Sequence, residues 1–184
     1  HNGQKVSSAF PIFAIAGDII IQRKSAEIWS LDKHPYNSKL GPIAKHLRHS
    51  KIRLGYFSAD FHNHATAYLM AELFERHDKD KFELIAFSFG PETKDEMQIR
   101  VSQAFDHFVN VANLSDLEIA LLSRELGIDI AIDLKGSTKD HRFGIFSYRA
   151  APVQVSYLGY PGTMGAEYID YLIADKTLIP EESQ

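Results

Sequence analysis

The sequence has 184 residues, of which 45% are hydrophobic and 24% are charged, and its formal net charge at pH 7 is −4. This composition is ordinary for a soluble globular protein and excludes a disordered chain. The net negative charge argues against a protein that binds nucleic acid through its bulk charge. Cysteine is absent, which excludes a disulfide scaffold, an iron–sulfur cluster, a cysteine-type zinc site and a cysteine nucleophile.

The longest apolar run, Ala9–Ala16, has eight residues, far fewer than the roughly 20 that cross a bilayer. Lys5 before this run gives a faint likeness to a signal peptide, which the single basic residue and the short run argue against. We therefore expect a cytoplasmic protein that does not act on membranes, with which the lack of cysteine is compatible. The chain starts at His1 without a methionine, and we expect it to be part of a longer protein.

Residues 1–48 differ in pattern from the rest, and we expect them to form a lead-in helix and a connector. The helix is predicted over residues 18–30, with one face made by Ile19, Ile20, Ile28 and Trp29. A basic stretch broken by proline and glycine follows and includes Gly41-Pro42 and residues 46–51. Residues 49–184 are expected to form the second unit.

From Lys51 onward, short β-rich runs alternate with helical segments, which is the pattern of βαβ units and a mostly parallel sheet. The expected strands are 52–57, 82–87, 107–111, 128–133, 153–158 and 171–174. The run 128–133 is almost entirely apolar, as in strands buried on both faces. The sequence therefore predicts an α/β, Rossmann-like layer of mostly parallel strands with flanking helices, in which 52–57 and 128–133 are internal.

Three longer helices are expected between these strands. The first covers 66–77, and its apolar face is formed by Leu69, Met70, Leu73 and Phe74. The second covers 95–105. The third begins at a capping box of Ser115 and Glu118 and ends near Gly127, where a C-cap glycine belongs. Its apolar face is formed by Leu117, Ala120, Leu121 and Leu122. Core residues of a further short helix are Phe143, Phe146 and Tyr148.

The loops after the strands carry the candidate functional residues, because ligands of open α/β sheets bind beyond the carboxyl ends of the strands. After the first strand, Asp60, His62 and His64 place a carboxylate beside imidazoles, which suits general acid–base chemistry near neutral pH. These positions fit a structural role equally well, in which Asp60 or Asn63 caps the next helix. His62 and His64 can also be read as two metal ligands, for which a third ligand is not evident.

Two further loops are expected on the same edge of the sheet. The loop 135–140 contains Lys135 and Lys139, which can face a phosphate but are more typical of solvated loop residues. The glycines of the loop 159–165 allow either close approach to a ligand or a tight turn. This loop has neither the lysine of a P-loop nor the spacing of a dinucleotide fingerprint.

Three segments resemble the catalytic region of the O-linked N-acetylglucosamine transferase family, which includes the SPINDLY-type O-fucosyltransferases. They are residues 55–66 (GYFSADFHNHAT), 133–138 (DLKGST) and 149–166 (RAAPVQVSYLGYPGTMGA), and the likeness continues through 169–175. Members of this family carry tetratricopeptide repeats followed by a two-lobed glycosyltransferase of the GT-B type. The resemblance implies that residues 49–180 form the N-terminal lobe of a bacterial member.

The resemblance also implies roles for individual residues. His64 matches the motif histidine that lies against the donor sugar and has been proposed as a base, and Asp60 matches a nearby aspartate proposed for proton handling. Thr66 matches a hydroxyl that lines the sugar pocket. The loop that flanks this pocket is matched by Leu158, Gly159 and Tyr160. The sequence departs from the proline, tyrosine and proline common in the family at Ala65, Ser137 and Ala151, which affects details of sugar and acceptor recognition.

The implied reaction is an inverting, metal-independent transfer without a cofactor, in which UDP-N-acetylglucosamine donates its sugar to Ser or Thr of a protein. The expected partners are the nucleotide-sugar, the protein acceptor, a C-terminal lobe with a lysine at the diphosphate, and the tetratricopeptide repeats. Without that lobe and the repeats, the chain is expected to be an inactive fragment. Three alternatives stay open: an O-fucosyltransferase, a non-catalytic interaction domain with this fold, and a free-standing receiver-like α/β domain.

Overall fold

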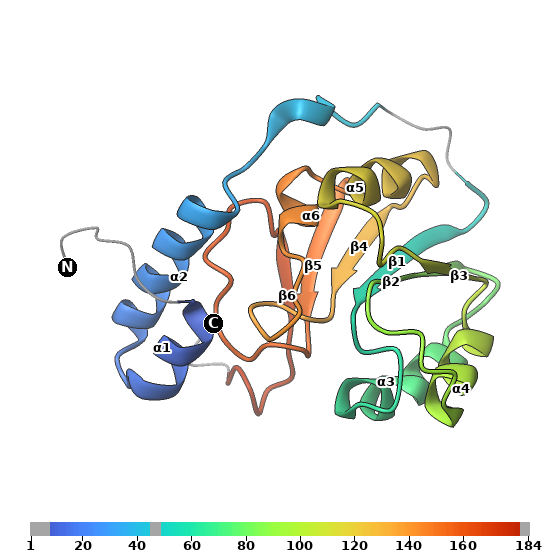
Figure 1. Ribbon diagram of the computed structural model, residues 1–184, viewed down its shortest axis with the longest axis horizontal. Coiled ribbons are helices and arrows are strands. Elements are labelled where there is room, and N and C mark those ends of the chain that lie inside the picture. Colours follow the sequence, from blue (N-terminus) through green and yellow to red (C-terminus); the bar gives the residue numbers. More distant parts are fainter. Residues whose placement is uncertain (1–7, 45–48, 181–184) are drawn as a thin grey trace.

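Six parallel strands form one sheet in the computed structural model, which describes residues 8–44 and 49–180 (Figure 1). The strands are β1 Ile52–Ser58, β2 Phe82–Ser88, β3 His107–Asn110, β4 Ile130–Asp133, β5 Val153–Tyr157 and β6 Tyr171–Ile173. Their order is β3-β2-β1-β4-β5-β6, which is the Rossmann order. The predicted fold class is therefore confirmed, and β1 and β4 are internal strands as expected.

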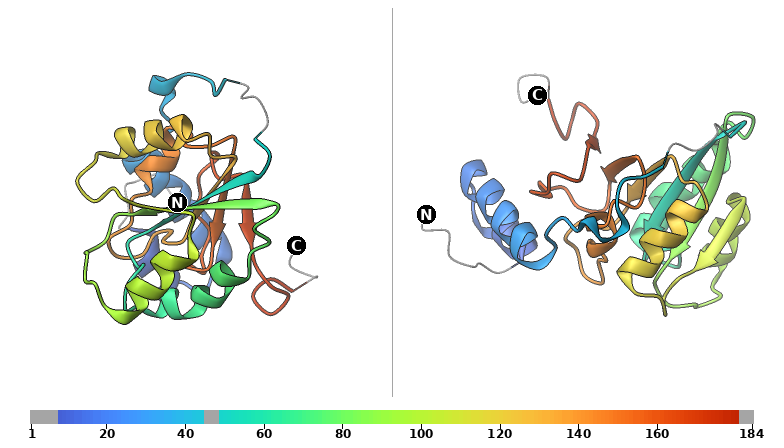
Figure 2. Two further views of the ribbon diagram at one scale, coloured as in Figure 1. Left: turned by 90° about the vertical axis from the view of Figure 1, so that its right-hand side faces the viewer. Right: turned by 90° about the horizontal axis from the view of Figure 1, so that it is seen from above.

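The helices cover both faces of this sheet. They are α1 Ala9–Ile15, α2 Ile19–Lys33, the 3-10 turn η1 Ser38–Leu40, α3 Ala65–Arg76, α4 Glu96–Ala104, α5 Asp116–Glu125 and α6 Gly144–Ser147. Helices α5 and α6 lie on one face, and α3 and α4 lie on the other (Figure 2). The predicted capping box of Ser115 and Glu118 starts α5, and Gly127 after its end has a positive φ of 63°.

Two hydrophobic cores lie on the two sides of the sheet because successive strand residues point to opposite faces. On β1, Phe57 belongs to the core under α5 and α6, whereas Tyr56 belongs to the core under α3 and α4. Phe57 stacks on Phe87 of β2 with ring centroids 4.3 Å apart. Apolar strands buried on both faces are what the near-continuous hydrophobic runs predicted.

The apolar faces predicted for three helices need correction. On α3 the buried residues are Ala67, Met70, Ala71 and Phe74, whereas Leu69 is 69% exposed and Leu73 is also exposed. The buried set follows the i, i+3, i+4, i+7 spacing of one helical stripe, and its two alanines let the helix approach the sheet closely.

On α5, Ile119, Ala120 and Ser123 are buried and Leu121 is exposed. On α2, Ser25, Ala26 and Ser30 are buried, whereas Ile19 and Ile20 are exposed.

The lead-in segment packs against the rest of the chain. The hydroxyl of Tyr168 donates a hydrogen bond to the carbonyl of His34 at 2.8 Å, and Ala26 contributes to the core under α5 and α6. Arg124 of α5 donates to the carbonyls of Leu40 and Gly41, both at 2.9 Å. These contacts hold α2 and the connector against the part of the chain that forms the sheet. The division of the chain at residue 49 stays a prediction.

Two expectations concern residues outside the described part of the chain. They are the signal-peptide likeness, which depends on Lys5, and part of the basic connector, residues 45–48. Within residues 8–44 and 49–180, no helix has both the length and the apolar character needed to cross a membrane.

Candidate functional site

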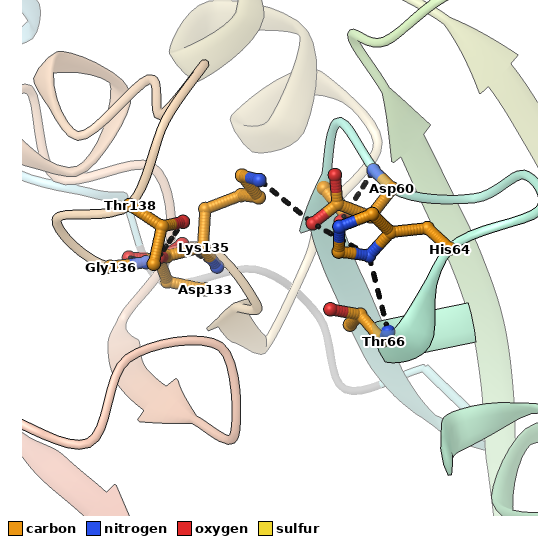
Figure 3. Close-up of polar contacts among 8 residues, drawn as sticks. Asp60, His64, Thr66, Asp133, Lys135, Gly136 and Thr138 are labelled. Atoms are coloured by element: carbon orange, nitrogen blue, oxygen red, sulfur yellow. Dashed lines mark hydrogen bonds and ion pairs between the residues drawn. The ribbon is translucent and has the colours of Figure 1, made fainter. Parts of the chain in front are cut away.

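The candidate site is formed by loops that follow three neighbouring strands. Strand β1 pairs with β4, and β4 pairs with β5, all in parallel. Their carboxyl ends therefore meet at one edge of the sheet, where ligands of this fold bind. Figure 3 shows the side chains of Asp60 and His64 on the β1 side facing Lys135 on the β4 side.

Asp60 and Lys135 form a buried ion pair between the first two loops. The ammonium of Lys135 donates to Oδ2 of Asp60 at 2.7 Å, and the side chains of Lys135 and Asp60 are only 6% and 9% exposed. The backbone N–H of Asp60 donates to Oγ of Ser58 at 2.9 Å. The expectation that Lys135 is a solvated loop residue is therefore wrong, because the parallel pairing of β1 and β4 brings its ammonium onto a carboxylate. Lys139 is exposed.

Asp133, the last residue of β4, shapes the loop that carries Lys135. Its Oδ1 accepts the N–H of Lys135 at 2.9 Å, and its Oδ2 accepts the N–H of Gly136 at 3.1 Å. Burial raises the pKa of Asp133 to about 6, although these two hydrogen bonds act in the opposite direction. Gly136 has a positive φ of 54°, a conformation that glycine adopts without steric cost. The turn therefore directs Lys135 back toward β1.

His64 is the N-cap of α3. Its Nδ1 accepts the N–H of Thr66 at 3.2 Å, and this same nitrogen lies 3.6 Å from Oδ2 of Asp60. The side chain of His64 is 43% exposed, so it is accessible to a ligand. The expected structural role of this loop, capping the helix, is thus performed by His64 rather than by Asp60 or Asn63. Thr66, whose residue is partly buried, belongs to the first turn of the same helix.

The third loop packs directly on the second. A Cβ on Gly159 would overlap the carbonyl of Leu134 and crowd Cα of Lys135, so only glycine permits this approach. Leu158 is exposed and has a φ of 63°, a left-handed conformation that is uncommon for leucine and is often found at functional sites. The side chain of Tyr160 is buried in the core. Its backbone, with that of residues 158 and 159, lies beside the Lys135 loop.

The structure therefore brings Asp60, His64 and Thr66 together and places the 158–160 loop next to them through Lys135. Their predicted catalytic and sugar-binding roles stay predictions. His62 lies beside His64, with ring centroids 5.8 Å apart. Within the described residues, no three His, Cys, Asp or Glu side chains gather to hold a metal ion at this pair or elsewhere.

A hollow of about 600 Å³ lies elsewhere on the described structure. It is lined by Tyr36, Pro42, Ile43, Arg149, Pro152, Glu167 and Tyr168. None of these residues belongs to the three loops. The ion pair and the exposed imidazole of the candidate site therefore lie apart from this hollow.

Sequence reasoning missed Lys135 and Asp133 as members of the site. A usable signal was present, because Asp133 ends a nearly all-apolar strand and Lys135 follows soon after it. A charged residue so close to a doubly buried strand needs a partner. The partner of Lys135 comes from a loop 75 residues earlier, and the sequence placed the two loops on one edge of the sheet without predicting this contact.

The chain is similar to known proteins in both sequence and fold. The model of glycosyl transferase family 41 matches residues 19–184. The protein of Arabidopsis thaliana named "Probable UDP-N-acetylglucosamine--peptide N-acetylglucosaminyltransferase SEC" is 36% identical over 147 residues, which are 79% of this chain and 15% of that protein. The Caenorhabditis elegans UDP-N-acetylglucosamine--peptide N-acetylglucosaminyltransferase is 34% identical over 131 residues, or 71% of this chain and 11% of that protein.

A SPINDLY protein of Arabidopsis thaliana is 29% identical over 136 residues, which are 72% of this chain and 15% of that protein. Among solved structures, a mutant O-GlcNAc transferase of Thermobaculum terrenum superposes with a TM-score of 0.84 at 30% identity. That match covers 95% of this chain and 34% of the solved chain. The chain therefore spans about a third of that structure and a smaller share of the other relatives.

Proposed function

Because this chain belongs to glycosyl transferase family 41, we propose that it is the donor-facing N-terminal lobe of an inverting protein O-glycosyltransferase. The proposed reaction moves N-acetylglucosamine from UDP-N-acetylglucosamine to a serine or threonine of a protein. The bond between C1 of the sugar and the diphosphate oxygen breaks, and a bond between C1 and the acceptor oxygen forms. The bonding electrons leave with the diphosphate, and the proton of the acceptor hydroxyl is released to solvent, so the products are the glycosylated protein, UDP and one proton.

The observation that carries this proposal is the meeting of a buried carboxylate and an exposed imidazole at the ligand-binding edge of the sheet. Oδ2 of Asp60 lies 3.6 Å from Nδ1 of His64, and both residues belong to the segment that resembles the family's entry into its catalytic region. In the proposal, His64 and Asp60 orient the sugar or assist the movement of the proton. Thr66 and the 158–160 loop line the sugar pocket.

The proposal assigns stabilisation of the departing diphosphate to a C-terminal lobe that is not among these 184 residues. Oriented donors at a developing charge usually make the greatest single contribution to lowering the barrier of such a reaction. Lys135 is a cation at this edge of the sheet, but its ammonium is already paired with Asp60. We therefore do not assign the stabilisation of the diphosphate to Lys135. The proposed transfer uses no metal ion or cofactor, takes place in the cytoplasm, and has a protein acceptor presented by tetratricopeptide repeats.

The choice of N-acetylglucosamine over fucose is supported by the relatives' names. The relatives that match at 36% and 34% identity are named for UDP-N-acetylglucosamine. The resemblance to SPINDLY-type O-fucosyltransferases makes GDP-fucose the alternative donor, although the SPINDLY protein that matches at 29% identity is itself named for UDP-N-acetylglucosamine. The donor is therefore part of the test.

The test incubates the intact polypeptide that contains this chain with a Ser/Thr-rich acceptor protein and one of two radiolabelled donors. UDP-N-acetylglucosamine is expected to label the acceptor, and alkaline β-elimination is expected to release the label as a sugar. Labelling from GDP-fucose alone would replace the donor in the proposal. A folded protein that labels nothing from either donor would instead favour the non-catalytic interaction domain.

A further inference from the structure

The ion pair of Asp60 and Lys135 lies directly beside the exposed imidazole of the site. Removing one member of a buried pair leaves the charge of the other without compensation. Each partner therefore keeps the other in its ionised, paired position. The pair also links two loops, because Asp60 follows β1 and Lys135 follows β4. Oδ2 of Asp60, the oxygen that accepts the ammonium at 2.7 Å, is the same oxygen that lies 3.6 Å from His64. A His64 with a proton on Nδ1 would therefore compete with Lys135 for one carboxylate oxygen.

The hydrogen bonds of His64 define which ring nitrogen carries the proton. Nδ1 accepts the N–H of Thr66, and a ring nitrogen that accepts a hydrogen bond carries no proton. The distance of 3.6 Å from Nδ1 to Asp60 is longer than a hydrogen bond. A neutral His64 in this arrangement therefore has its proton on Nε2, where it is a donor toward a ligand rather than an acceptor of a proton.

We propose, on the basis of the function proposed above, that Lys135 is a positioning residue for the transfer reaction. By holding the carboxylate of Asp60, it leaves Nδ1 of His64 on the Thr66 amide and directs Nε2–H toward the bound sugar-nucleotide. In its absence, Asp60 attracts a proton to Nδ1. His64 then becomes an imidazolium or turns its ring from the Thr66 amide toward the carboxylate.

The charged surroundings of His64 allow this effect to be isolated. Asp60 lies beside His64 and is paired with Lys135, and His62 on the same loop has its ring centroid 5.8 Å away. Asp95, at the start of α4, accepts the N–H of Asn63 at 3.0 Å and lies near His62. Variants at positions 60 and 135 leave His62 and Asp95 unchanged, so a change in the titration of His64 reports on the ion pair.

The experiment measures the pH dependence of His64 modification by diethyl pyrocarbonate, which reacts with unprotonated imidazole, in the intact polypeptide without any sugar donor. Tandem mass spectrometry separates His64 from His62. Lys135→Met is expected to raise the pH at which His64 modification is half-maximal by about one unit, because an unpaired carboxylate nearby favours the imidazolium. This pH is called the midpoint below. Asp60→Asn is expected to lower the midpoint, since it leaves Lys135 as the uncompensated charge. Lys135→Arg is expected to leave it unchanged.

The double variant Asp60→Asn/Lys135→Met removes both charges and is expected to restore the original midpoint. Replacing both members of a buried pair is tolerated better than removing one, so this variant and Asp60→Asn keep the test available if Lys135→Met does not fold. Midpoints that agree in every folded variant would overturn the proposal and leave the pair a purely structural one. This readout needs no transferase activity, so it fails or succeeds separately from the proposed function.

A second measurement connects the pair to the reaction. If transfer is found, Lys135→Met is expected to lower kcat by about 10-fold or more and to shift the acidic limb of the pH–rate profile upward with the His64 midpoint. Lys135→Arg is expected to retain the parent kcat and the parent position of the acidic limb. A kcat loss with an unshifted pH profile would contradict the positioning role.

Discussion

His64 caps a helix in this structure and, in the proposed reaction, also contacts the donor. Its Nδ1 caps α3 by accepting the N–H of Thr66, and its half-exposed ring faces the edge of the sheet where a ligand would bind. A capping side chain contributes about 0.5–2 kcal/mol to stability. An imidazole that hydrogen-bonds a charged substrate group contributes about 1.5–3 kcal/mol to binding in the ground state or transition state. Substitutions can remove one of these functions and keep the other.

We expect His64→Asn to keep the cap and lose the imidazole, because asparagine is among the best N-cap residues. Its melting temperature should stay close to that of the parent protein, while turnover in the intact polypeptide falls by about 10- to 100-fold. His64→Ala should lose both and melt earlier. Thermal unfolding and initial-rate assays of the two variants side by side check this. Full turnover in His64→Asn would reduce His64 to a capping residue.

His64 and Lys135 differ in how well the sequence predicted their place in the candidate site. His64 was identified because its loop follows a predicted strand and contains several ionisable residues close together in the sequence. Lys135 was missed because its partner lies in another loop, and the pairing of β1 with β4 is a tertiary fact. Local sequence identifies which residues are at the edge of the sheet, whereas the order of the strands decides which of them meet.

Among the individual elements, the sequence predicted the strands and helices α2 to α5 well, missed helix α1, and predicted the buried faces of the helices less well. Strand bounds differ from the predicted ones by at most two residues. On α3, however, large leucines suggested the inward face, whereas the structure buries the neighbouring stripe with its alanines. The reason is that a helix lying on a flat sheet needs small residues at the closest contact. The stripe that contains small residues therefore faces the sheet, although the neighbouring stripe with Leu69 and Leu73 is more hydrophobic.

Paired variants on α3 test this correction. Met70 is 1% exposed and Leu69 is 69% exposed. Met70→Ala should therefore lower the free energy of unfolding by about 2–5 kcal/mol, as expected for a buried large-to-small change. Leu69→Ala should change it by less than about 0.5 kcal/mol. Urea denaturation followed by circular dichroism measures both, and comparable losses for the two variants would restore the predicted face.

At the scale of the whole molecule, the seam between the lead-in segment and the lobe contains two histidines. His34, at the end of α2, lies edge-on to His141 with ring centroids 5.6 Å apart. Burial lowers the pKa of both residues below its usual value, and the carboxylate of Asp116 acts in the opposite direction. In the unfolded chain, both histidines therefore bind protons at a higher pH than in the folded one.

We expect the protein to lose stability as the pH falls below about 6.5, the usual pKa of histidine. The unfolded state binds more protons than the folded state in this range, so lowering the pH favours unfolding. Asp133 opposes this trend, since its raised pKa of about 6 favours the protonated folded state. The variant His34→Gln/His141→Gln, with Asp133 unchanged, should flatten the decline in melting temperature between about pH 7.5 and 5.5. An equally steep decline in this variant would exclude the two histidines as its cause.

We also expect residues 1–184 alone to fold and yet to transfer no sugar. Two cores on opposite faces of the sheet give the fold a sufficient interior. Losing a single oriented interaction at a developing charge costs about 3–4 kcal/mol, and loss of orientation between reactants can cost roughly 7–11 kcal/mol. Incubation of the purified chain with radiolabelled UDP-N-acetylglucosamine and an acceptor protein measures this, with a no-enzyme control. Labelling above that control that depends on His64 would contradict it.

The place of β1 in the sheet has a consequence during synthesis. This strand pairs with β2 on one side and on the other with β4, whose partner residues are made 76 positions later. At about 5–20 residues per second, a ribosome needs roughly 4–15 s to add them. For that time, the flank of β1 that later pairs with β4 presents free N–H and C=O groups, an unpaired strand edge prone to aggregation. Folding of the nascent chain therefore depends on protecting this edge of β1 until β4 has been made.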